Sequence, residues 1–281
     1  MDINSKIDAL SISRAKMRIT DFQKKKIQQE KITMLTCYDY PSARILADSG
    51  VECVLVGDSV AMAVHGLKNT LMATMPMMIM HTEAVARGVH QQLLITDLPF
   101  LCHKISKSDT VNNARLLLQA GAQALKIEGG DNDTCATIEY LVNAGIPILG
   151  HIGLTPQYIY QLGGYKIQGK THDQADELLA QAKRLENSGC QAIILECIPE
   201  LVGQVITESL SIPTIGIGAG RYTDGQVLVW HDLLGMQDEF KPKFIKQYAC
   251  IKPIVLEAIN HYVTQVKNVE FPGVEHIFSN N

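Results

Sequence analysis

The stretch VECVLVGDSVAM, residues 51–62, begins as a short apolar run rich in β-branched residues and then places a carboxylate, Asp58, directly after it. An apolar run of this length, bounded by glycine and polar residues, is typical of a buried β-strand. Strands that are apolar on both faces are typical of parallel sheets, because helices cover both sides of such a sheet. The stretch therefore predicts the strand of a βα unit with an acid at its carboxyl end.

The same pattern recurs along the chain, as an apolar run, a polar or glycine-containing turn and a longer stretch with helical periodicity. We expect strands at 32–39, 51–58, 92–100, 123–130, 146–153, 191–199, 212–220 and 226–235. Stretches with helical periodicity lie at 40–50, 82–89, 108–122, 133–145, 175–189 and 199–210. Several of them end near a glycine that suits a left-handed helix stop, namely Gly50, Gly121, Gly145 and Gly189.

About eight such units in 281 residues predict a closed parallel (β/α)8 TIM barrel of the α/β class. A doubly wound open sheet is the alternative that the pattern leaves open. Outside the repeats we expect an N-terminal capping helix in the first thirty residues and a C-terminal helical extension after Phe240, with a long helix over 244–268. No linker or low-complexity segment divides the chain, which predicts one domain over 1–281.

The composition is typical of a soluble globular protein, with 46% hydrophobic and 19% charged residues and a formal net charge of −4. The basic residues are scattered, which argues against nucleic acid or an anionic membrane as a partner. No segment approaches the about 18 consecutive apolar residues of a membrane span, and the start of the chain lacks a signal-peptide pattern. We therefore expect a cytoplasmic protein that acts on small molecules. Its seven cysteines form no Cys-x-x-Cys pair and are expected to be reduced core thiols.

Four carboxylates and one histidine close expected strands: Asp58, Asp97, Glu128, Glu196 and His151. In a parallel barrel the carboxyl ends of the strands form one face, so these side chains are expected to converge there. Carboxylates that are brought together raise one another's pKa, and burial adds to the penalty. Positive charge should therefore lie among them.

Two sources of that charge are evident. Hard oxygen ligands without a cluster of cysteine or histidine indicate Mg²⁺ or a similar ion, which takes few protein carboxylates and keeps water or substrate oxygens as further ligands. Lys126 is the second source, because it lies two residues before Glu128 and both side chains then point to the same side of a strand.

Each residue also has a plainer structural interpretation. Asp58 is compatible with a helix N-cap, and Asp97, which precedes a Leu-Pro pair, with a turn residue. Lys126 and Glu128 are compatible with a structural ion pair, and Glu196 with burial against an arginine or lysine. These interpretations explain the residues one at a time, whereas the convergence of all four carboxylates is explained better by a functional site.

Three further features have structural interpretations. His151 follows Gly150, and a strand-end histidine is more often hydrogen-bonded in place than catalytic. The glycines of IGIGAG, residues 215–220, alternate and do not form the Gly-x-Gly-x-x-Gly pattern of dinucleotide sites. The methionine-rich stretch 71–81 favours adaptable packing or a mobile loop over a cofactor site.

Many ordered segments of the chain are similar to one known family. They include LTCYDYPSARILADSG, VLVGDS, HTEAVARG, ITDLPF, AGAQALKIEGG, GIPILGHIGLTPQ, GGYKIQGK, LECIP, IPTIGIGAG, TDGQVLVWHD and FPGVEH. In these segments, from about Ile19 to His276, the chain resembles the ketopantoate hydroxymethyltransferases, also called 3-methyl-2-oxobutanoate hydroxymethyltransferases.

The resemblance implies a (β/α)8-barrel enzyme of pantothenate synthesis. Such an enzyme moves a one-carbon unit from 5,10-methylenetetrahydrofolate to 3-methyl-2-oxobutanoate, which gives 2-dehydropantoate, and it uses Mg²⁺ and assembles as a homodecamer. By its motifs the resemblance implies metal ligation by Asp58, Asp97 and Glu128. It implies keto-acid binding by Asp58, Ser59, Asp97 and Lys126. It implies that Glu196 is the catalytic base.

Two departures concern the chain between the second and third expected strands. Ala61 stands where the family pattern leads us to expect glycine, and TLMATMPMMIM replaces a pattern that usually continues TLPVT with an acidic stretch. Two alternative functions stay open. One is a Mg²⁺-dependent lyase or aldolase on another 2-oxo acid, in which a Schiff base on Lys126 is disfavoured because Glu128 stabilises the charged ammonium. The other is a ligand-binding barrel without catalysis.

Overall fold

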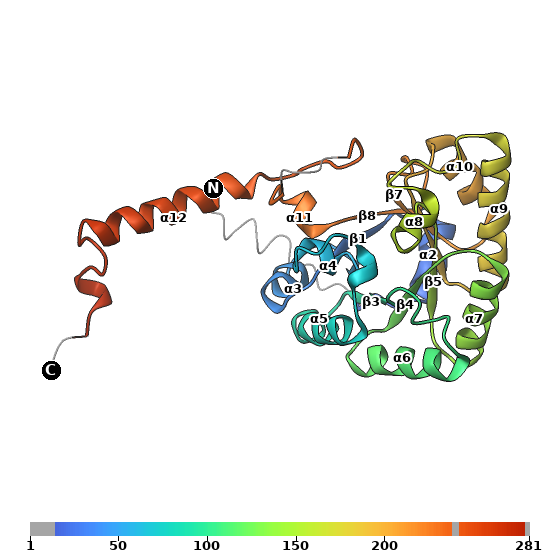
Figure 1. Ribbon diagram of the computed structural model, residues 1–281, viewed down its shortest axis with the longest axis horizontal. Helices are drawn as coiled ribbons and strands as arrows, with labels where there is room; N and C mark the ends of the chain where they lie inside the picture. The colour runs from blue at the N-terminus through green and yellow to red at the C-terminus, as the bar shows by residue number, and fades with distance from the viewer. Residues whose placement is uncertain (1–14, 238–241, 279–281) are drawn as a thin grey trace. The chain divides into compact units, whose positions relative to one another are not determined.

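The computed structural model describes residues 15–237 and 242–278. Its strands form a closed parallel barrel in the order β1-β2-β3-β4-β5-β6-β7-β8 (Figure 1). Their bounds are β1 Ile32–Thr36, β2 Cys53–Val56, β3 Leu93–Asp97, β4 Ala124–Glu128, β5 Ile148–Gly153, β6 Ala192–Glu196, β7 Thr214–Ile217 and β8 Gly225–Leu228. β1 pairs with β8 in parallel, Ile32 opposite Gly225, and this pairing closes the cylinder. The predicted (β/α)8 barrel is confirmed, and the open sheet is excluded.

Helices follow the strands around the outside of the barrel (Figure 1). The longer ones are α3 Tyr40–Ala47, α5 Met75–Gly88, α6 Lys107–Gln119, α7 Asn132–Asn143, α9 His172–Asn187 and α10 Glu200–Ser209. Short elements lie after β2 and β5, namely α4 Val60–Ala63, η1 Thr70–Met72, η2 Pro156–Tyr158 and α8 Ile159–Leu162. Thr171 starts α9 with a capping box, in which its side chain and that of Gln174 each accept a backbone N–H of the other. Such a cap contributes about 1 kcal/mol to helix stability.

Glycine ends three of the helices as expected. Gly121, Gly145 and Gly189 have φ values of +113°, +86° and +90°, in the left-handed region that glycine adopts without a steric penalty. Gly50 does not have a positive φ, because α3 stops earlier, at a right-handed Asp48.

One hydrophobic core fills the barrel and extends below it. It contains Ile32, Met34, Cys53, Leu55, Leu93, Ile95, Ala124, Leu149, Ala192, Ile194, Ile215 and Val227. Phe22 of helix α2, Asp21–Gln28, is fully buried in the same cluster. Many members of this cluster, such as Ile32, Cys53 and Leu93, are the first residues of their strands. Helix α2 therefore covers the N-terminal end of the barrel, and the expected capping helix is confirmed. The expectation for residues 1–14 lies outside the described residues.

The methionine-rich stretch is helical. It forms η1 and the first turns of α5, which begins at Met75 and not near Thr82 as expected. The hydroxyl of Thr74 accepts the N–H of Met77 at 3.4 Å, Pro76 lies in the first turn, where proline is tolerated, and Met78 is fully buried. The alternative of a loop is therefore wrong for the part in α5, and the interpretation as packing is confirmed for Met78, whereas Met72 and Met80 are exposed.

Contacts between Cα atoms divide the chain into two compact units, Met1–Val229 and Trp230–Asn281. The second unit contains α11 Trp230–Leu233, α12 Ile251–Lys267 and η3 Val274–His276. The helix expected over 244–268 begins only at Ile251, which places Pro253 in its first turn. The strand expected over 226–235 ends at Leu228, and its second half forms α11. The single domain over 1–281 stays a prediction.

Two findings concern the environment of the chain. Within the described residues no helix is both long enough and apolar enough to cross a membrane. All seven cysteines are free thiols. Cys37, Cys53, Cys135 and Cys190 are buried as expected, but Cys102 and Cys197 are half-buried and Cys250 is exposed, so the expectation of core thiols is wrong for Cys250.

Candidate active site

The strand-end polar residues continue the inward-facing series of their strands. In β3 the series runs from Leu93 through Ile95 to Asp97, and the first two of these residues belong to the barrel core. The series of β4 and β6 likewise end in Glu128 and Glu196, and that of β5 includes His151. Because side chains alternate along a strand, the interior is apolar at depth and becomes polar at the carboxyl ends.

Lys126 lies at the centre of this polar group. Its Nζ is 3.1 Å from Oδ2 of Asp97 and 3.4 Å from Oε1 of Glu128. All three side chains are almost completely buried. Burial alone lowers the pKa of Lys126, but the nearby carboxylates of Asp97, Glu128 and Asp58 outweigh it and hold the pKa above its usual value. The ammonium is therefore charged at neutral pH, so the expected ion pair with Glu128 exists and a Schiff base on Lys126 is disfavoured.

Asp58 and Asp97 meet across the ends of β2 and β3. The backbone N–H of Asp58 donates to Oδ2 of Asp97 at 2.9 Å. Burial is the largest cause that raises the pKa of both carboxyls, and for Asp58 the charges of Glu128 and Asp97 raise it further. The side chain of Asp58 does not cap α4, and Asp97 is the last residue of β3, so the helix-cap and turn interpretations of these two residues are wrong.

Glu128 is held by donors on both of its oxygens. Oε1 is 3.4 Å from Lys126 Nζ and 3.2 Å from His151 Nδ1, and Oε2 accepts the backbone N–H of Gln157 at 2.9 Å. Burial opposes its charge, but Lys126, His151 and Gln157 more than compensate and lower the pKa of Glu128 to about 2. Glu128 is therefore ionised throughout the physiological range.

His151 joins Glu128 to Glu196. Its Nε2 lies 3.3 Å from Oε2 of Glu196, an ion-pair distance without the alignment of a good hydrogen bond. Burial and Lys126 lower the pKa of His151, but contacts with Glu128 and Glu196 prevail and raise it to about 9. The imidazole is therefore a cation between two carboxylates. Glu196 pairs with this histidine and not with the arginine or lysine that its structural interpretation required.

Glu196 is the most accessible of the strand-end acids. Its side chain is 17% exposed, whereas that of Glu128 is 1% exposed and that of Asp97 is 2% exposed. A group that exchanges a proton with a bound molecule has to reach that molecule, and among the acids at these strand ends Glu196 is best placed to do so.

Gln157 and Tyr38 belong to the site, although the sequence analysis assigned no role to either. The Gln157 amide donates to Oδ2 of Asp58 at 2.8 Å and to the carbonyl oxygen of Leu98 at 3.0 Å. The hydroxyl of Tyr38 lies 2.8 Å from Oγ of Ser59, a predicted binding residue that precedes α4. Gln157 lies in η2, a single turn that is too short to show periodicity, so only its place at the end of the segment GIPILGHIGLTPQ, after the expected strand 146–153, pointed to it.

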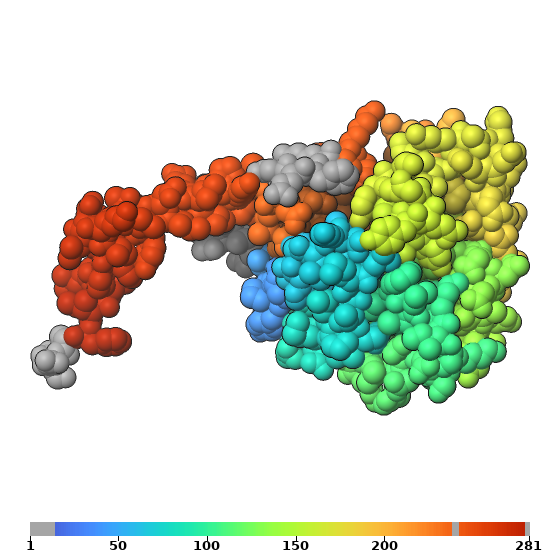
Figure 2. Space-filling view, viewed as in Figure 1, coloured from blue at the N-terminus to red at the C-terminus, as the bar shows by residue number. Residues whose placement is uncertain are grey.

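The segment 156–170 lies beside the α4–η1 region at the carboxyl end of the barrel (Figure 2). The Asn69 amide donates to the hydroxyl of Tyr160 at 3.4 Å, and the hydroxyl of Tyr165 lies 3.7 Å from Sδ of Met62. Partial burial, with the carboxylates of Glu196, Asp58 and Glu128, raises the pKa of Tyr165. This segment therefore borders the acidic site, and the neighbouring Ala61 is buried inside α4.

The residues fit a hard divalent cation in part. In residues 15–237 and 242–278 no group of three or more His, Cys, Asp and Glu side chains is arranged to hold an ion. The three predicted ligands do not form such a group for two reasons. Lys126 lies among them, and both oxygens of Glu128 already accept hydrogen bonds or ion pairs from protein groups. Asp58 and Asp97 remain suitable, because Oδ1 of Asp97 is buried without a hydrogen-bond partner among the described residues. Two carboxylates suffice for Mg²⁺, which keeps most of its other positions for water or substrate.

Acids, a charged lysine and a histidine thus gather at the carboxyl end of a parallel barrel, where the active sites of barrel enzymes lie. The fold and the site define a (β/α)8-barrel enzyme equipped for acid–base chemistry on a small polar molecule.

Comparison with known sequences also identifies the chain as an enzyme and shows its family. The sequence profile of the family described as ketopantoate hydroxymethyltransferase matches residues 16–274. The 3-methyl-2-oxobutanoate hydroxymethyltransferase of Legionella pneumophila (strain Lens) is 64% identical, over 93% of this chain and 100% of its own length. The protein of the same name from Thermoanaerobacter sp. (strain X514) is 47% identical, over 94% of this chain and 96% of its own. The chain belongs to the ketopantoate hydroxymethyltransferase family, a family of transferases.

Solved structures with the same fold are distant in sequence. A phosphonopyruvate hydrolase has a TM-score of 0.62 at 11% identity, with 94% of this chain and 92% of the other covered. A 2,3-dimethylmalate lyase, described as a member of the PEP mutase/isocitrate lyase superfamily, has a TM-score of 0.58 at 16% identity, with coverages of 93% and 92%. At these identities the likeness concerns the barrel fold alone.

Proposed function

We propose that the protein transfers the one-carbon unit of 5,10-methylenetetrahydrofolate to 3-methyl-2-oxobutanoate, which forms 2-dehydropantoate in pantothenate synthesis. The C3–H bond of the keto acid breaks, a C–C bond to the methylene carbon forms, and water supplies the hydroxyl group as tetrahydrofolate leaves. Family membership supports the reaction. The observation that carries it is the charged Lys126 among Asp97 and Glu128, next to the more accessible Glu196.

Glu196 is the proposed base that removes the C3 proton. Its carboxylate is partly exposed at the end of β6 and is held by the imidazole of His151. His151 in turn is fixed by Glu128, so the orientation of Glu196 does not depend on the substrate. A base that is held in position in this way can contribute about 100-fold or more to the rate.

Asp58, Ser59, Asp97 and Lys126 are the proposed binding residues for the keto acid. The Lys126 ammonium can stabilise negative charge that develops on the keto oxygen as the proton leaves, because it is buried and already charged. Tyr38 orients the Ser59 hydroxyl, which can then donate to a substrate oxygen.

Mg²⁺ is the proposed ion of the site. Asp58 and Asp97 would hold it, and Glu128, the third ligand suggested by the resemblance, adds negative charge to the same group. When it is bound, the ion polarises the keto and carboxylate oxygens of the substrate and so makes the C3 proton more acidic. Positive charge from the ion would be added beside Asp58, since Lys126 already pairs with Asp97 and His151 with Glu128.

A homodecamer in the cytoplasm, which acts without nucleic acid or membrane, completes the proposal. The resemblance to the family supports the decamer. Light scattering on the purified protein measures the assembly, and a mass other than ten chains would contradict the decamer.

The experiment that tests the proposed reaction uses purified protein, 3-methyl-2-oxobutanoate, methylenetetrahydrofolate labelled with ¹³C in the methylene group, and Mg²⁺. We expect ¹³C in the hydroxymethyl group of 2-dehydropantoate, measured by mass spectrometry. Exchange of the C3 proton without any such product would favour the lyase or aldolase on another 2-oxo acid. Neither exchange nor product would favour a barrel that only binds ligands.

A further inference from the structure

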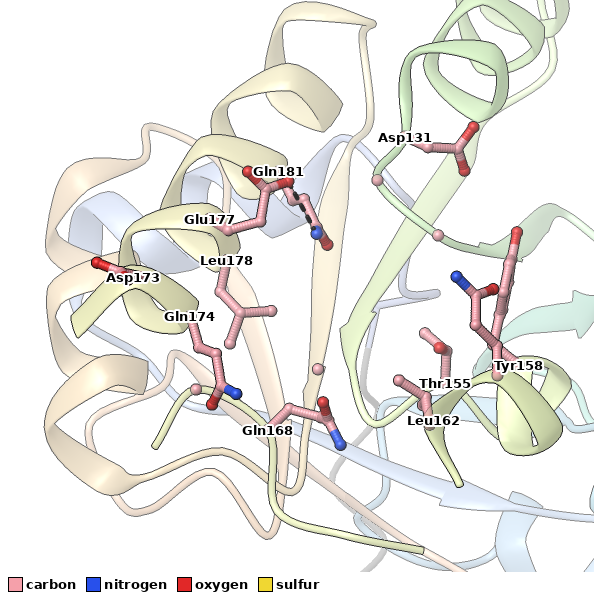
Figure 3. Close-up of a pocket in the computed structure, with 15 residues that line it drawn as sticks. Asp131, Thr155, Tyr158, Leu162, Gln168, Asp173, Gln174, Glu177, Leu178 and Gln181 are labelled. Carbon is pink, nitrogen blue, oxygen red and sulfur yellow. Dashed lines mark hydrogen bonds between the residues drawn. The ribbon is translucent and has the colours of Figure 1, made fainter. Parts of the chain in front are cut away.

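A pocket of about 420 Å³ adjoins the proposed site on the side of β4 to β6. Figure 3 shows one wall formed by α9, with Gln174, Leu178 and Gln181, and the opposite wall formed by Thr155, Leu162 and other residues of the loops after β4 and β5. The volume is in the usual range for pockets that bind small organic molecules. None of the residues that line the pocket has a role in the reaction as proposed so far.

The pocket is close to the proposed base. Gly153 lines the pocket and pairs in register with Glu196 of β6. A Cβ atom on Gly153 would lie 2.2 Å from the carbonyl oxygen of Glu196, so only glycine allows this approach of the two chains. The N–H of Gln168, another lining residue, donates to the carbonyl oxygen of Cys197 at 2.9 Å. A ligand in the pocket is therefore next to the backbone that carries Glu196.

Two glutamine side chains offer acceptors to the pocket. Nε2 of Gln168 donates to the carbonyl oxygen of Lys166 at 2.9 Å, and no described donor bonds its Oε1. Nε2 of Gln181 donates to Oε1 of Glu177 at 3.1 Å, and no described donor bonds the Oε1 of Gln181. Each amide is thus fixed through its nitrogen and presents an oxygen.

Gln174 offers a donor. Its Oε1 accepts the backbone N–H groups of Lys170 and Thr171 at 3.0 and 3.4 Å, so its Nε2 is left to donate. Apolar side chains lie on both sides of the pocket, Leu178 from α9 and Leu162 from α8 (Figure 3). The pocket therefore suits a flat ring whose edge carries both donors and an acceptor.

A reduced pterin has such an edge, with the 2-amino group and N3–H as donors and the 4-oxo group as acceptor. In the proposed reaction the folate carries this ring, and the keto acid does not. Charge gives little preference, because two of the three carboxylates that line the pocket are paired with cations, Asp131 with Lys104 and Glu177 with Arg184. The pterin ring is neutral, so it needs no charged partner in this pocket.

We propose that this pocket binds the pterin ring of 5,10-methylenetetrahydrofolate. Gln168 and Gln181 accept hydrogen bonds from the 2-amino group and N3–H, Gln174 donates to the 4-oxo group, and the glutamate tail points to solvent. This inference rests on the proposed function, which supplies the folate. It adds the binding place of the one-carbon donor, which lies beside the backbone of Glu196 and outside the group of residues that holds the keto acid.

The double variant Gln168→Leu/Gln181→Leu tests the pocket. We expect the KM for methylenetetrahydrofolate to rise about tenfold, which corresponds to two lost hydrogen bonds between neutral groups. The KM for the keto acid and the rate of C3 proton exchange without donor should not change. Gln204→Leu is the matched control, because Gln204 donates to Glu208 at 2.8 Å across one helical turn, as Gln181 does to Glu177, but on α10. The control should leave both KM values as in the wild type.

Two results would separate the pocket from the reaction. A folded double variant with the wild-type KM for the donor would overturn the pocket while the reaction stands. A wild-type protein that forms no product would overturn the proposed function and the pocket with it. If the double variant does not fold, 6-methyltetrahydropterin, which lacks the tail, is tested on the wild type. Competition with the donor is the expected result, and no competition would overturn the proposal.

Discussion

The imidazole of His151 lies with Nε2 3.3 Å from Oε2 of Glu196. The other ring nitrogen, Nδ1, lies 3.2 Å from Glu128, and the two carboxylates raise the pKa of the ring to about 9 although burial opposes this. A cationic ring between two acids attracts the accessible acid, Glu196, to one side of the site. His151 is thus a positioning residue for the proposed base.

His151→Asn tests this positioning role. Without the imidazolium, Glu196 loses the group that orients it, so we expect kcat to fall roughly tenfold or more while the KM for the keto acid changes little. Steady-state kinetics with varied keto acid measures the two constants. His172→Asn, an exposed change at the start of α9, is the control. A rise in KM at constant kcat would show that His151 acts in binding instead.

Asp58→Asn tests the ion site. Asparagine keeps the size of the side chain and an oxygen that can accept from Gln157, but it removes the charge that a hard cation requires. We expect the affinity for Mg²⁺, measured by calorimetry in the absence of substrates, to fall about tenfold or more. Asp176→Asn, an exposed change on α9, should leave it as in the wild type. Equal affinities of the Asp58 variant and the wild type would remove Asp58 from the site.

Lys126→Met tests the balance of buried charge. The substitution leaves the carboxylates of Asp97 and Glu128 without their common cation, which costs about 3–5 kcal/mol of unfolding free energy. Urea unfolding without Mg²⁺ measures the loss. Adding Asp97→Asn should restore part of it, because one of the unpaired charges is then removed. A double variant no more stable than Lys126→Met alone would show that the charges are not coupled.

His103 should make the protein sensitive to acid. Burial, with a smaller effect of Lys104, lowers the pKa of this ring to about 4, and neither ring nitrogen has a hydrogen-bond partner among the described residues. Above about pH 6.5 the ring is neutral in both the folded and unfolded states, so it causes no loss of folding stability. Between about pH 6.5 and 4 the unfolded chain binds a proton that the folded chain does not, and the stability falls by up to about 3 kcal/mol.

His103→Leu removes that proton-binding difference. We expect the fall in Tm between pH 7 and pH 5 to be smaller in the variant than in the wild type. Differential scanning calorimetry at both pH values gives the comparison. The same fall in both proteins would show that other groups cause the acid sensitivity.

Sequence alone predicted the site residues whose positions follow from regular secondary structure. Asp97, Glu128 and Glu196 end strands, so alternation along each strand and the geometry of a parallel barrel bring them to one face. Gln157 was missed, because it lies in the three-residue turn η2, which is too short for a period to indicate where its side chain points. The position of Lys126 among the acids was predicted from its spacing to Glu128, but its contact with Asp97 was not, since spacing fixes the face of a strand and not which acid the long side chain meets.

The errors at element boundaries have similar causes. The run 226–235 is mostly apolar but contains His231 and Asp232, which lie in α11, and periodicity does not distinguish a buried strand from a short helix in such a short run. The start of α5 was missed because methionines at 75–80 show no polar face, although Thr74 and Pro76 form a typical helix start. The pterin pocket depends on which amide atoms are already bonded, and this information exists only in three dimensions.

The central claim is that Glu196, at the accessible end of the acidic group, removes the C3 proton of 3-methyl-2-oxobutanoate. Proton NMR in D₂O, with Mg²⁺ and without any folate, measures the exchange of that proton directly. We predict rapid exchange with the wild type and a loss of about 100-fold or more with Glu196→Gln, with keto-acid binding retained by calorimetry. Exchange at the wild-type rate in the Glu196→Gln protein would contradict the account.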